Sequence, residues 1–186
     1  MFLDRDGVIN EGGQINRLED VHVFPLAGPA IERLRAAGYA IVVVTNQGGL
    51  GEGFDGQKVW RKAPLERRDL DAIHLEMLRQ LGPEAAPDLI KVCPHASFLN
   101  CRCRKPKPGM IHSAARELGL DLSASYLVGD RTTDLEAGLA AGVQPILVLT
   151  GDGEKSRGQW QGNEPVVASI WEAMEVIVSS TNQSAF

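Results

Sequence analysis

Residues 1–7 read MFLDRDG, so three apolar residues run directly into two carboxylates, Asp4 and Asp6. In an extended segment alternate side chains share a face, and the two carboxylates would point together if the strand continued. Gly7 indicates that the strand ends here, because glycine tolerates the backbone conformations that break a strand. Ligands bind at the carboxyl edge of a parallel sheet, and two close like charges there favour a divalent cation. An acidic turn that caps a helix has the same letters, so the pair alone is a weak signal for chemistry.

Three later segments add polar groups in comparable positions. Residues 42–48 read VVVTNQG and residues 126–134 read YLVGDRTTD, and each places a polar group directly after a strand-like apolar run. Residues 101–109 read CRCRKPKPG and supply lysines. Because parallel strands deliver such groups to one edge of a sheet, the sequence predicts a polar site assembled from distant segments.

Together these segments resemble, in order, the four motifs of the haloacid dehalogenase superfamily: paired aspartates, a Ser/Thr, a Lys and Gly-Asp-x-x-x-Asp. The similarity covers about residues 2–151 and is closest to the small capless branch. The resemblance implies an α/β fold with a three-layer Rossmann-like parallel sheet, helices on both faces and no large cap domain. It also implies a Mg²⁺-dependent phosphatase that forms an aspartyl-phosphate.

The resemblance assigns roles to individual residues. Asp4 would attack phosphorus, and Asp6 would act as the general acid and then as the general base. Thr45 and Lys105 would stabilise the transferring phosphoryl group. Lys105 is preferred to Lys107 because the family motif places its lysine directly after Cys-Arg. The other expected site residues are the Mg²⁺ ligands Asp4, Asp6 (through its backbone carbonyl) and Asp130, the positioning residue Asp134, and the substrate-binding residues Asn46, Gln47, Arg104 and Arg131.

The substrate is expected to be a small phosphorylated metabolite. The run PKPGM at residues 106–110 and the lack of a fused second enzyme resemble the members that act on a heptose bisphosphate. Residues 129–134 and 49–51 look more like the members that act on histidinol phosphate. Arg131 replaces a lysine often found in the heptose enzymes, yet Arg104 and Arg131 would suit a second phosphate group. The prediction is removal of the C7 phosphate of D-glycero-D-manno-heptose 1,7-bisphosphate, with histidinol phosphate as the alternative.

All three cysteines fall within residues 93–103, in the pattern C-x-H-x5-C-x-C. Three thiolates and one imidazole make a closed tetrahedral zinc site, and an odd number of cysteines suits a disulfide framework poorly. Four protein ligands leave no position for an activated water, so a structural Zn²⁺ is expected on Cys93, His95, Cys101 and Cys103. Reduced cysteines without a metal are the alternative.

Length, composition and net charge limit the classes of protein to which the chain can belong. With 186 residues and 44% hydrophobic content, the chain can bury the core of a single domain, residues 1–186. A net charge of -5 argues against a nucleic-acid partner. No run approaches the ~20 apolar residues of a membrane span, and the chain does not open like a signal peptide. A cytoplasmic, monomeric enzyme is expected.

Two other classes fit part of the sequence. A metal-dependent glycosyltransferase would use Asp-x-Asp, but it would not need the lysine motif or the late Gly-Asp. A non-catalytic zinc module would explain residues 93–103 and leave the other motifs unexplained. A kinase would want a Walker loop, which the sequence lacks.

Apolar periodicity predicts alternating strands and helices, and such repeats imply a parallel sheet with helices on both faces. The first strand has only three residues before Asp4, fewer than the usual ~5, so it is either unusually short or continued by residues before Met1. The expected strands are 40–44, 89–92, 126–128 and 145–150, and the expected helices are 29–37, about 65–81, 109–118, 133–141 and 166–177.

Three segments are predicted to lack regular structure. Residues 11–22 are polar without a clear period and are interpreted as a flap over the substrate. Residues 48–64 contain five glycines and are interpreted as a surface loop, and residues 152–165 as an irregular connection. The three tryptophans, Trp60, Trp160 and Trp171, are too scattered to form a stacking platform and are interpreted as packing or surface residues.

Overall fold

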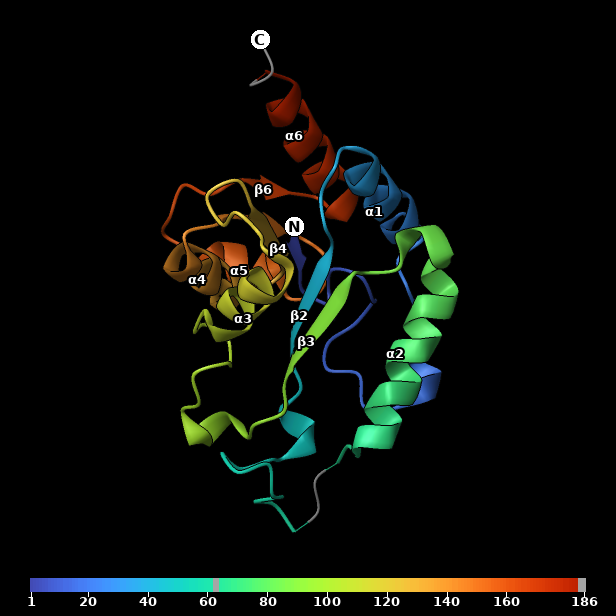
Figure 1. Cartoon of the computed structure of the whole chain (residues 1–186), viewed down its shortest axis with the longest axis vertical. Coiled ribbons are helices and arrows are strands. Elements are labelled where there is room, and N and C mark those ends of the chain that lie inside the picture. The colour runs from blue at the N-terminus through green and yellow to red at the C-terminus, as the bar shows by residue number, and fades with distance from the viewer. Residues whose placement is uncertain (62–63, 184–186) are drawn as a thin grey trace.

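A parallel sheet of six strands forms the middle layer of the computed structural model, which describes residues 1–61 and 64–183 (Figure 1). The strand order is β3-β2-β1-β4-β5-β6, with the chain's first strand in the middle of the sheet. The strands are β1 (Phe2–Leu3), β2 (Val42–Asn46), β3 (Leu89–Cys93), β4 (Tyr126–Gly129), β5 (Gln144–Val148) and β6 (Val166–Val167).

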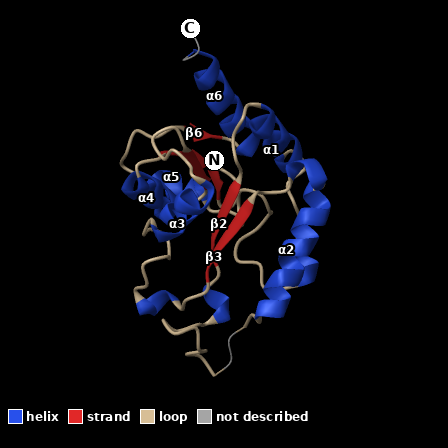
Figure 2. Ribbon diagram, viewed as in Figure 1, coloured by secondary structure: helices blue, strands red, loops and turns tan. Residues whose placement is uncertain are grey.

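Helices cover both faces of the sheet, with α1, α2 and α6 on one side and α3, α4 and α5 on the other (Figure 2). The helices are α1 (Ala27–Ala36), α2 (Arg67–Leu81), α3 (Gly109–Leu118), α4 (Thr132–Ala141), α5 (Gly153–Gln159) and α6 (Ile170–Gln183). Short 3-10 turns lie at Leu18–Asp20, Gly48–Leu50, Pro83–Ala85 and Ser97–Leu99. The predicted three-layer α/β architecture is confirmed.

Alternate residues of the strands build two aliphatic cores. Leu3 pairs in register with Val43 and Val128, and all three belong to the core under α1, α2 and α6. Phe2 is one residue earlier and belongs with its strand neighbours to the core under α3 and α4. Although β1 has only two residues, it is hydrogen-bonded on both sides and fully buried.

Two predictions for the C-terminal third are wrong. Residues 152–165 were expected to be irregular, but Gly153–Gln159 form helix α5. Only Gly153 and Ser156 are buried in α5, so this segment lacks the apolar periodicity from which a helix is predicted. The expected helix 166–177 begins at Ile170, because Val166 and Val167 pair with β5 as the edge strand β6. Within the described residues, no helix is both long and apolar enough to span a membrane.

The carboxyl ends of the strands carry the loops that can surround a ligand. The flap, residues 11–22, begins and ends at neighbouring backbone positions, since Glu11 N donates to His22 O at 2.7 Å. Ile15 and Val21 are buried and anchor the flap to the core under α1 and α2. The zinc loop, residues 93–103, starts at the last residue of β3. The sheet therefore brings the flap, the zinc loop and the residues after β1, β2 and β4 to one edge.

Candidate active site

Asp4 and Asp130 lie side by side because they follow neighbouring central strands, β1 and β4. The main chain continues the pairing one step further, with Asp4 N donating to Val128 O at 3.0 Å. Two glycines with positive φ, Gly7 and Gly151, close around the Asp130 carboxylate. A Cβ on either would come within 2.1–2.2 Å of Asp130 Oδ2, so no larger residue fits at either position.

Three buried carboxylates form a cluster at this point: Asp4, Asp130 and Asp134 each place one oxygen within 4.8 Å of the others. Asp130 Oδ2 accepts a bond from Asp152 N at 2.8 Å, while Asp130 Oδ1 is buried and has no hydrogen-bond partner among the residues that the structure describes. Burial, and secondly the charge of Asp4, raise the pKa of Asp130 to about 7. Crowded carboxylate oxygens are the ligands that Mg²⁺ prefers, so the residues present fit a divalent cation.

Lys105 is buried between two members of this cluster. Its Nζ lies 2.9 Å from Asp4 Oδ1 and 2.7 Å from Asp134 Oδ1. Burial alone would lower the pKa of Lys105, but the charges of Asp134 and Asp4 outweigh it and hold the pKa above its usual range. The structure thus keeps a charged ammonium beside the carboxylate expected to attack phosphorus.

Asn46, expected to bind substrate, has both polar side-chain atoms on the main chain of Lys105. Its Nδ2 donates to Lys105 O at 3.1 Å, and its Oδ1 accepts from Lys105 N at 3.1 Å. Asn46 also lines the cavity described below. In this arrangement Asn46 fixes where the lysine stands, and its contact with substrate stays a prediction.

Asp6 is not a member of the carboxylate cluster, and its carboxylate is bound by neighbouring side chains. The guanidinium of Arg5, which has no exposed surface, donates to the two Asp6 carboxylate oxygens at 2.7 and 2.9 Å. Gln47 is also fully buried, and its Nε2 donates to Thr45 Oγ1 at 2.8 Å and to Asp6 Oδ2 at 3.4 Å. Gln47 therefore connects two expected catalytic residues, while its predicted role in binding substrate is untested. Sequence reasoning missed Arg5, whose only signal was its position between the two aspartates.

Two adjoining cavities of about 470 and 240 Å³ open above these residues. Asp4, Arg104 and Arg131 line both cavities, so the arginines lie where the sequence placed them. The larger cavity also reaches Lys105 and Asp134, and the smaller reaches Asp6 and Thr45. Arg131 pairs with Asp152 at 2.9 Å, and both side chains are about half exposed. Arginine forks at the rim suit an anionic ligand.

Two residues on the smaller cavity were not expected there. Gln14, from the flap, lines it, and the role of residues 11–22 as a flap over the substrate stays a prediction. Trp60 lines it as well, although nothing in the sequence pattern distinguishes Trp60 from the other two tryptophans. A tryptophan in a loop is brought to a cavity only by long-range packing, which local patterns do not record.

The four expected zinc ligands meet in one cluster. The three sulfur–sulfur distances are 3.3–3.5 Å, and His95 Nδ1 lies 3.0 Å from Cys103 Sγ and 3.6 Å from Cys93 Sγ. A tetrahedral Zn²⁺ with ~2.3 Å bonds to sulfur needs sulfur–sulfur distances of ~3.8 Å, so a small expansion would admit the ion. The hydrogen bond with Cys93, and secondly the contacts with Cys101 and His95, lower the pKa of Cys103 to about 5, against the effect of burial. The cluster thus fits a closed zinc site.

Removal of this metal should loosen the active site, because Arg104 and Lys105 directly follow the last ligand. We expect the purified protein to contain about one Zn²⁺ per chain, measured by inductively coupled plasma mass spectrometry. Cys101→Ser should remove the ion, lower the melting temperature by ~10 °C and reduce activity. His95→Ala should have the same effects, and His112→Ala, which changes a histidine outside the cluster, is its matched control. If the wild-type protein contains no zinc and melts at the same temperature as Cys101→Ser, the assignment of the cluster as a zinc site is contradicted.

Comparisons with known sequences give a consistent group. A family model described as HAD-hydrolase-like matches residues 102–173. The D-glycero-beta-D-manno-heptose-1,7-bisphosphate 7-phosphatase of Pseudomonas aeruginosa is 40% identical over 163 residues, 86% of this chain and 85% of that protein. The protein of the same name from Bordetella bronchiseptica is 35% identical over 188 residues, covering 100% and 98%. A D-glycero-alpha-D-manno-heptose-1,7-bisphosphate 7-phosphatase of Photorhabdus laumondii is 34% identical over 158 residues, covering 81% and 82%.

Solved structures agree with the sequences. The D,D-heptose 1,7-bisphosphate phosphatase from B. bronchiseptica, complexed with magnesium and phosphate, matches with a TM-score of 0.84 at 34% identity, over 97% of this chain and 98% of that chain. The D,D-heptose 1,7-bisphosphate phosphatase from Burkholderia thailandensis matches with a TM-score of 0.66 at 31% identity, over 96% and 97%. These proteins share nearly the full length of the chain as well as its fold.

Proposed function

Since the chain belongs to the haloacid dehalogenase-like hydrolase family, we propose that it is a Mg²⁺-dependent phosphatase that removes the C7 phosphate of D-glycero-D-manno-heptose 1,7-bisphosphate. The supporting observation is the meeting of Asp4, Lys105 and Asp130 in one buried cluster beside two arginine-lined cavities. The alternatives from other classes, a glycosyltransferase and a non-catalytic zinc module, fit neither the family nor the relatives, which are phosphatases by name.

Asp4 is the proposed nucleophile. Its Oδ1 is held by Arg5 N at 2.7 Å and by Lys105 Nζ at 2.9 Å, which orients the carboxylate and leaves Oδ2 for in-line attack on phosphorus. The phosphorus–oxygen bond to the sugar breaks as the Asp4–phosphorus bond forms, and water then hydrolyses the aspartyl-phosphate. Splitting the reaction in this way replaces one difficult displacement by two easier ones.

Asp6 supplies the proton transfers in the proposed mechanism. It protonates the oxygen that leaves with the sugar and later takes a proton from the attacking water. Arg5 and Gln47 set the position of its carboxylate before substrate arrives, and that carboxylate must turn toward the leaving oxygen to donate. Thr45 and Lys105 donate to the phosphoryl oxygens, where negative charge accumulates in the transition state.

Asp4, Asp130 and the backbone carbonyl of Asp6 would hold Mg²⁺, which when bound offsets the repulsion between the phosphate and the carboxylates. Asp134 accepts from Arg131 N at 3.0 Å and contacts Lys105, and it is proposed to position the lysine. Arg104 and Arg131 are proposed to bind the phosphate that is not hydrolysed. Zn²⁺ on the zinc loop is proposed to be structural.

A substrate panel tests the proposal. Phosphate release is measured with the α and β anomers of the heptose bisphosphate, histidinol phosphate and a nucleoside monophosphate, each with Mg²⁺ and with EDTA. We expect one anomer of the heptose bisphosphate to exceed histidinol phosphate in kcat/KM by at least ~100-fold, with loss from C7 confirmed by ³¹P NMR. EDTA should abolish turnover. If histidinol phosphate ranks first, the heptose assignment is wrong even though the protein is a phosphatase.

A further inference from the structure

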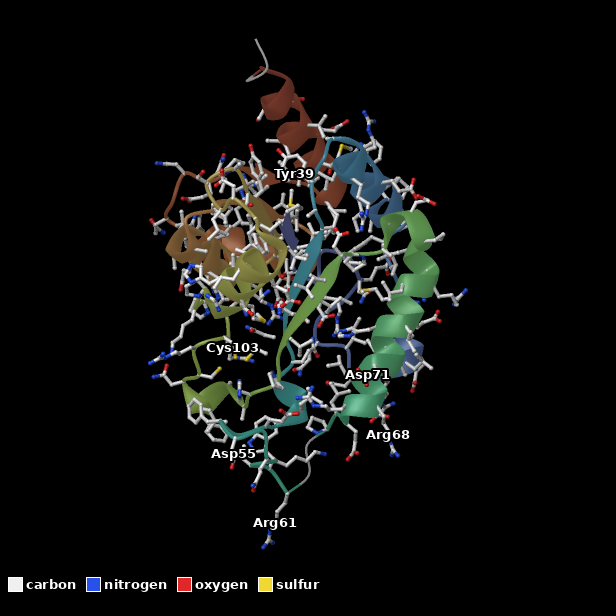
Figure 3. All side chains as sticks on the ribbon, in the orientation of Figure 1. Tyr39, Asp55, Arg61, Arg68, Asp71 and Cys103 are labelled. Atoms are coloured by element: carbon white, nitrogen blue, oxygen red, sulfur yellow. The ribbon has the colours of Figure 1, made fainter. Side chains whose placement is uncertain are left out.

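Residues 51–59, here called the hairpin loop, fold back on themselves within the segment expected to be a plain surface loop. Val59 N donates to Gly51 O at 2.8 Å, Gly53 N donates to Gln57 O at 2.6 Å, and Glu52 pairs with Lys58 in an antiparallel bridge. Figure 3 labels Asp55 at the outer end of this loop and, just after it, Arg61, whose side chain points away from the body. The loop has a defined shape, and its two ends are close together.

The hairpin loop is fastened to the zinc loop along its first strand. Glu52 N donates to Pro94 O at 3.1 Å, and Ala96 N donates to Glu52 O at 3.3 Å. The ring of Phe54 lies 6.0 Å from the imidazole of His95. These contacts bring residues 52–54 against the loop that carries the expected zinc ligands.

An ion pair between the buried Glu52 and Arg67 also holds the hairpin loop in place. The Glu52 side chain is only 8% exposed, and it pairs with Arg67, at the start of α2, at 2.8 Å. The following residues are therefore held between the zinc loop and α2. A side chain carried by such a support loses little conformational freedom when it binds a ligand.

Trp60 is the residue that this support presents to the site. Trp60 lines the smaller cavity together with Asp4, Asp6, Thr45 and Arg104. Its ring centroid lies 6.1 Å from that of Phe98, in the zinc loop, with the planes inclined by 40°. Phe98 is 65% exposed, and its neighbour Ser97 lines the same cavity. The cavity thus joins phosphate-binding polar groups to an aromatic surface.

We propose that Trp60 determines substrate specificity by stacking on the apolar C–H face of the sugar ring while the phosphates are bound by the polar groups. The inference rests on the proposed function. A sugar ring carries hydroxyls on its rim and C–H groups on its faces, and an indole offers a large, rigid apolar surface that matches such a face. Thr45 and Asp6, which are proposed to act on the reacting phosphate, line the same cavity as Trp60.

The kinetic test compares a sugar substrate with one that cannot reach Trp60. The ratio of kcat/KM for the heptose bisphosphate to kcat/KM for acetyl phosphate should fall about tenfold in Trp60→Ala, equivalent to ~1.4 kcal/mol. Trp60→Phe should restore most of the ratio, because a phenyl ring can still stack. Trp160→Phe and Trp171→Phe are matched controls, since Trp160 bonds to Glu164 and Trp171 packs under Arg33, outside the two cavities. A ratio within twofold of wild type in Trp60→Ala overturns the inference.

Fluorescence gives an independent readout without turnover. In Asp4→Asn carrying Trp160→Phe and Trp171→Phe, Trp60 is the sole tryptophan. Addition of the heptose bisphosphate should change its emission saturably, and the same protein with Trp60→Phe and Trp171 retained should show no change. If the emission of Trp60 does not change when the heptose bisphosphate is added at concentrations above the KM of the wild-type enzyme, the inference is also overturned. If wild type hydrolyses neither acetyl phosphate nor the sugar, the proposed function fails instead, so the two failures are distinguishable.

Discussion

Asp4→Asn is expected to reduce turnover by at least ~1,000-fold, equivalent to ~4 kcal/mol of transition-state stabilisation. The amide of asparagine has the same shape as the carboxylate and can still accept bonds from Arg5 N and Lys105 Nζ, so the site geometry should persist. It is not a nucleophile, so the phosphoenzyme cannot form. Phosphate release under saturating Mg²⁺ measures the loss, and trapping with hydroxylamine should detect the aspartyl-phosphate in wild type alone.

Loss of activity in Asp4→Asn should not come from unfolding. After burial, the charge of Asp4 is the largest cause that raises the pKa of Asp130. Neutralising Asp4 therefore relieves repulsion in the cluster. The melting temperature in EDTA should therefore be equal to or higher than that of wild type. Asp71→Asn, in the first half of α2 (Figure 3), makes the same charge change at an exposed position and should retain full activity. Residual activity above ~1% in Asp4→Asn would remove Asp4 from the nucleophile role.

Lys105→Ala is expected to cost ~100- to 1,000-fold in kcat, because the substitution removes the cation next to the transferring phosphoryl group. It also leaves Asp134, only 1% exposed, without its partner at 2.7 Å. Breaking a buried pair from one side costs ~3–5 kcal/mol, so the melting temperature in EDTA should fall by ~10 °C. Turnover is measured well below that temperature, which separates the catalytic loss from unfolding.

Lys107→Ala is the matched control for Lys105→Ala. Lys107 is two residues further along the same loop, and its Nζ donates to the backbone oxygen of Asn100 at 2.8 Å rather than to a member of the carboxylate cluster. A change of no more than about threefold in kcat is expected. If Lys107→Ala is the more damaging substitution, the phosphate-binding role passes to Lys107.

The sheet and the centre of the site were predictable because both depend on short-range patterns. Each central strand is a run of apolar residues, and the polar residue that follows it must emerge at the carboxyl edge. Asp4, Thr45 and Asp130 are such residues, and the structure brings them to that edge. The clustering of Cys93, His95, Cys101 and Cys103 was predictable for a similar reason, since all four fall within eleven consecutive residues, 93–103.

The remaining features depend on contacts between distant segments. Thr45 and Asn46 are the last two residues of β2, and Gln47 follows them, but the sequence could not show that Asn46 binds the main chain of Lys105, fifty-nine residues away. Trp60 reaches the cavity only because the hairpin loop docks on the zinc loop. Helix α5 has no apolar face by which it could be predicted. The two valines of the edge strand β6 could equally be the first residues of a helix, so the sequence pattern does not distinguish the two structures.

The two glycines that enclose Asp130 separate the positions that must be kept in a redesign from the loops that can be varied. Gly7 and Gly151 leave no space for even a methyl group, so a mutant library that varies these positions would consist of inactive clones. The flap, in contrast, contributes Gln14 from outside the sheet, and Trp60 directly follows the hairpin loop. New substrate preferences should therefore be selected by randomising those two loops while the glycines and the carboxylate between them are kept.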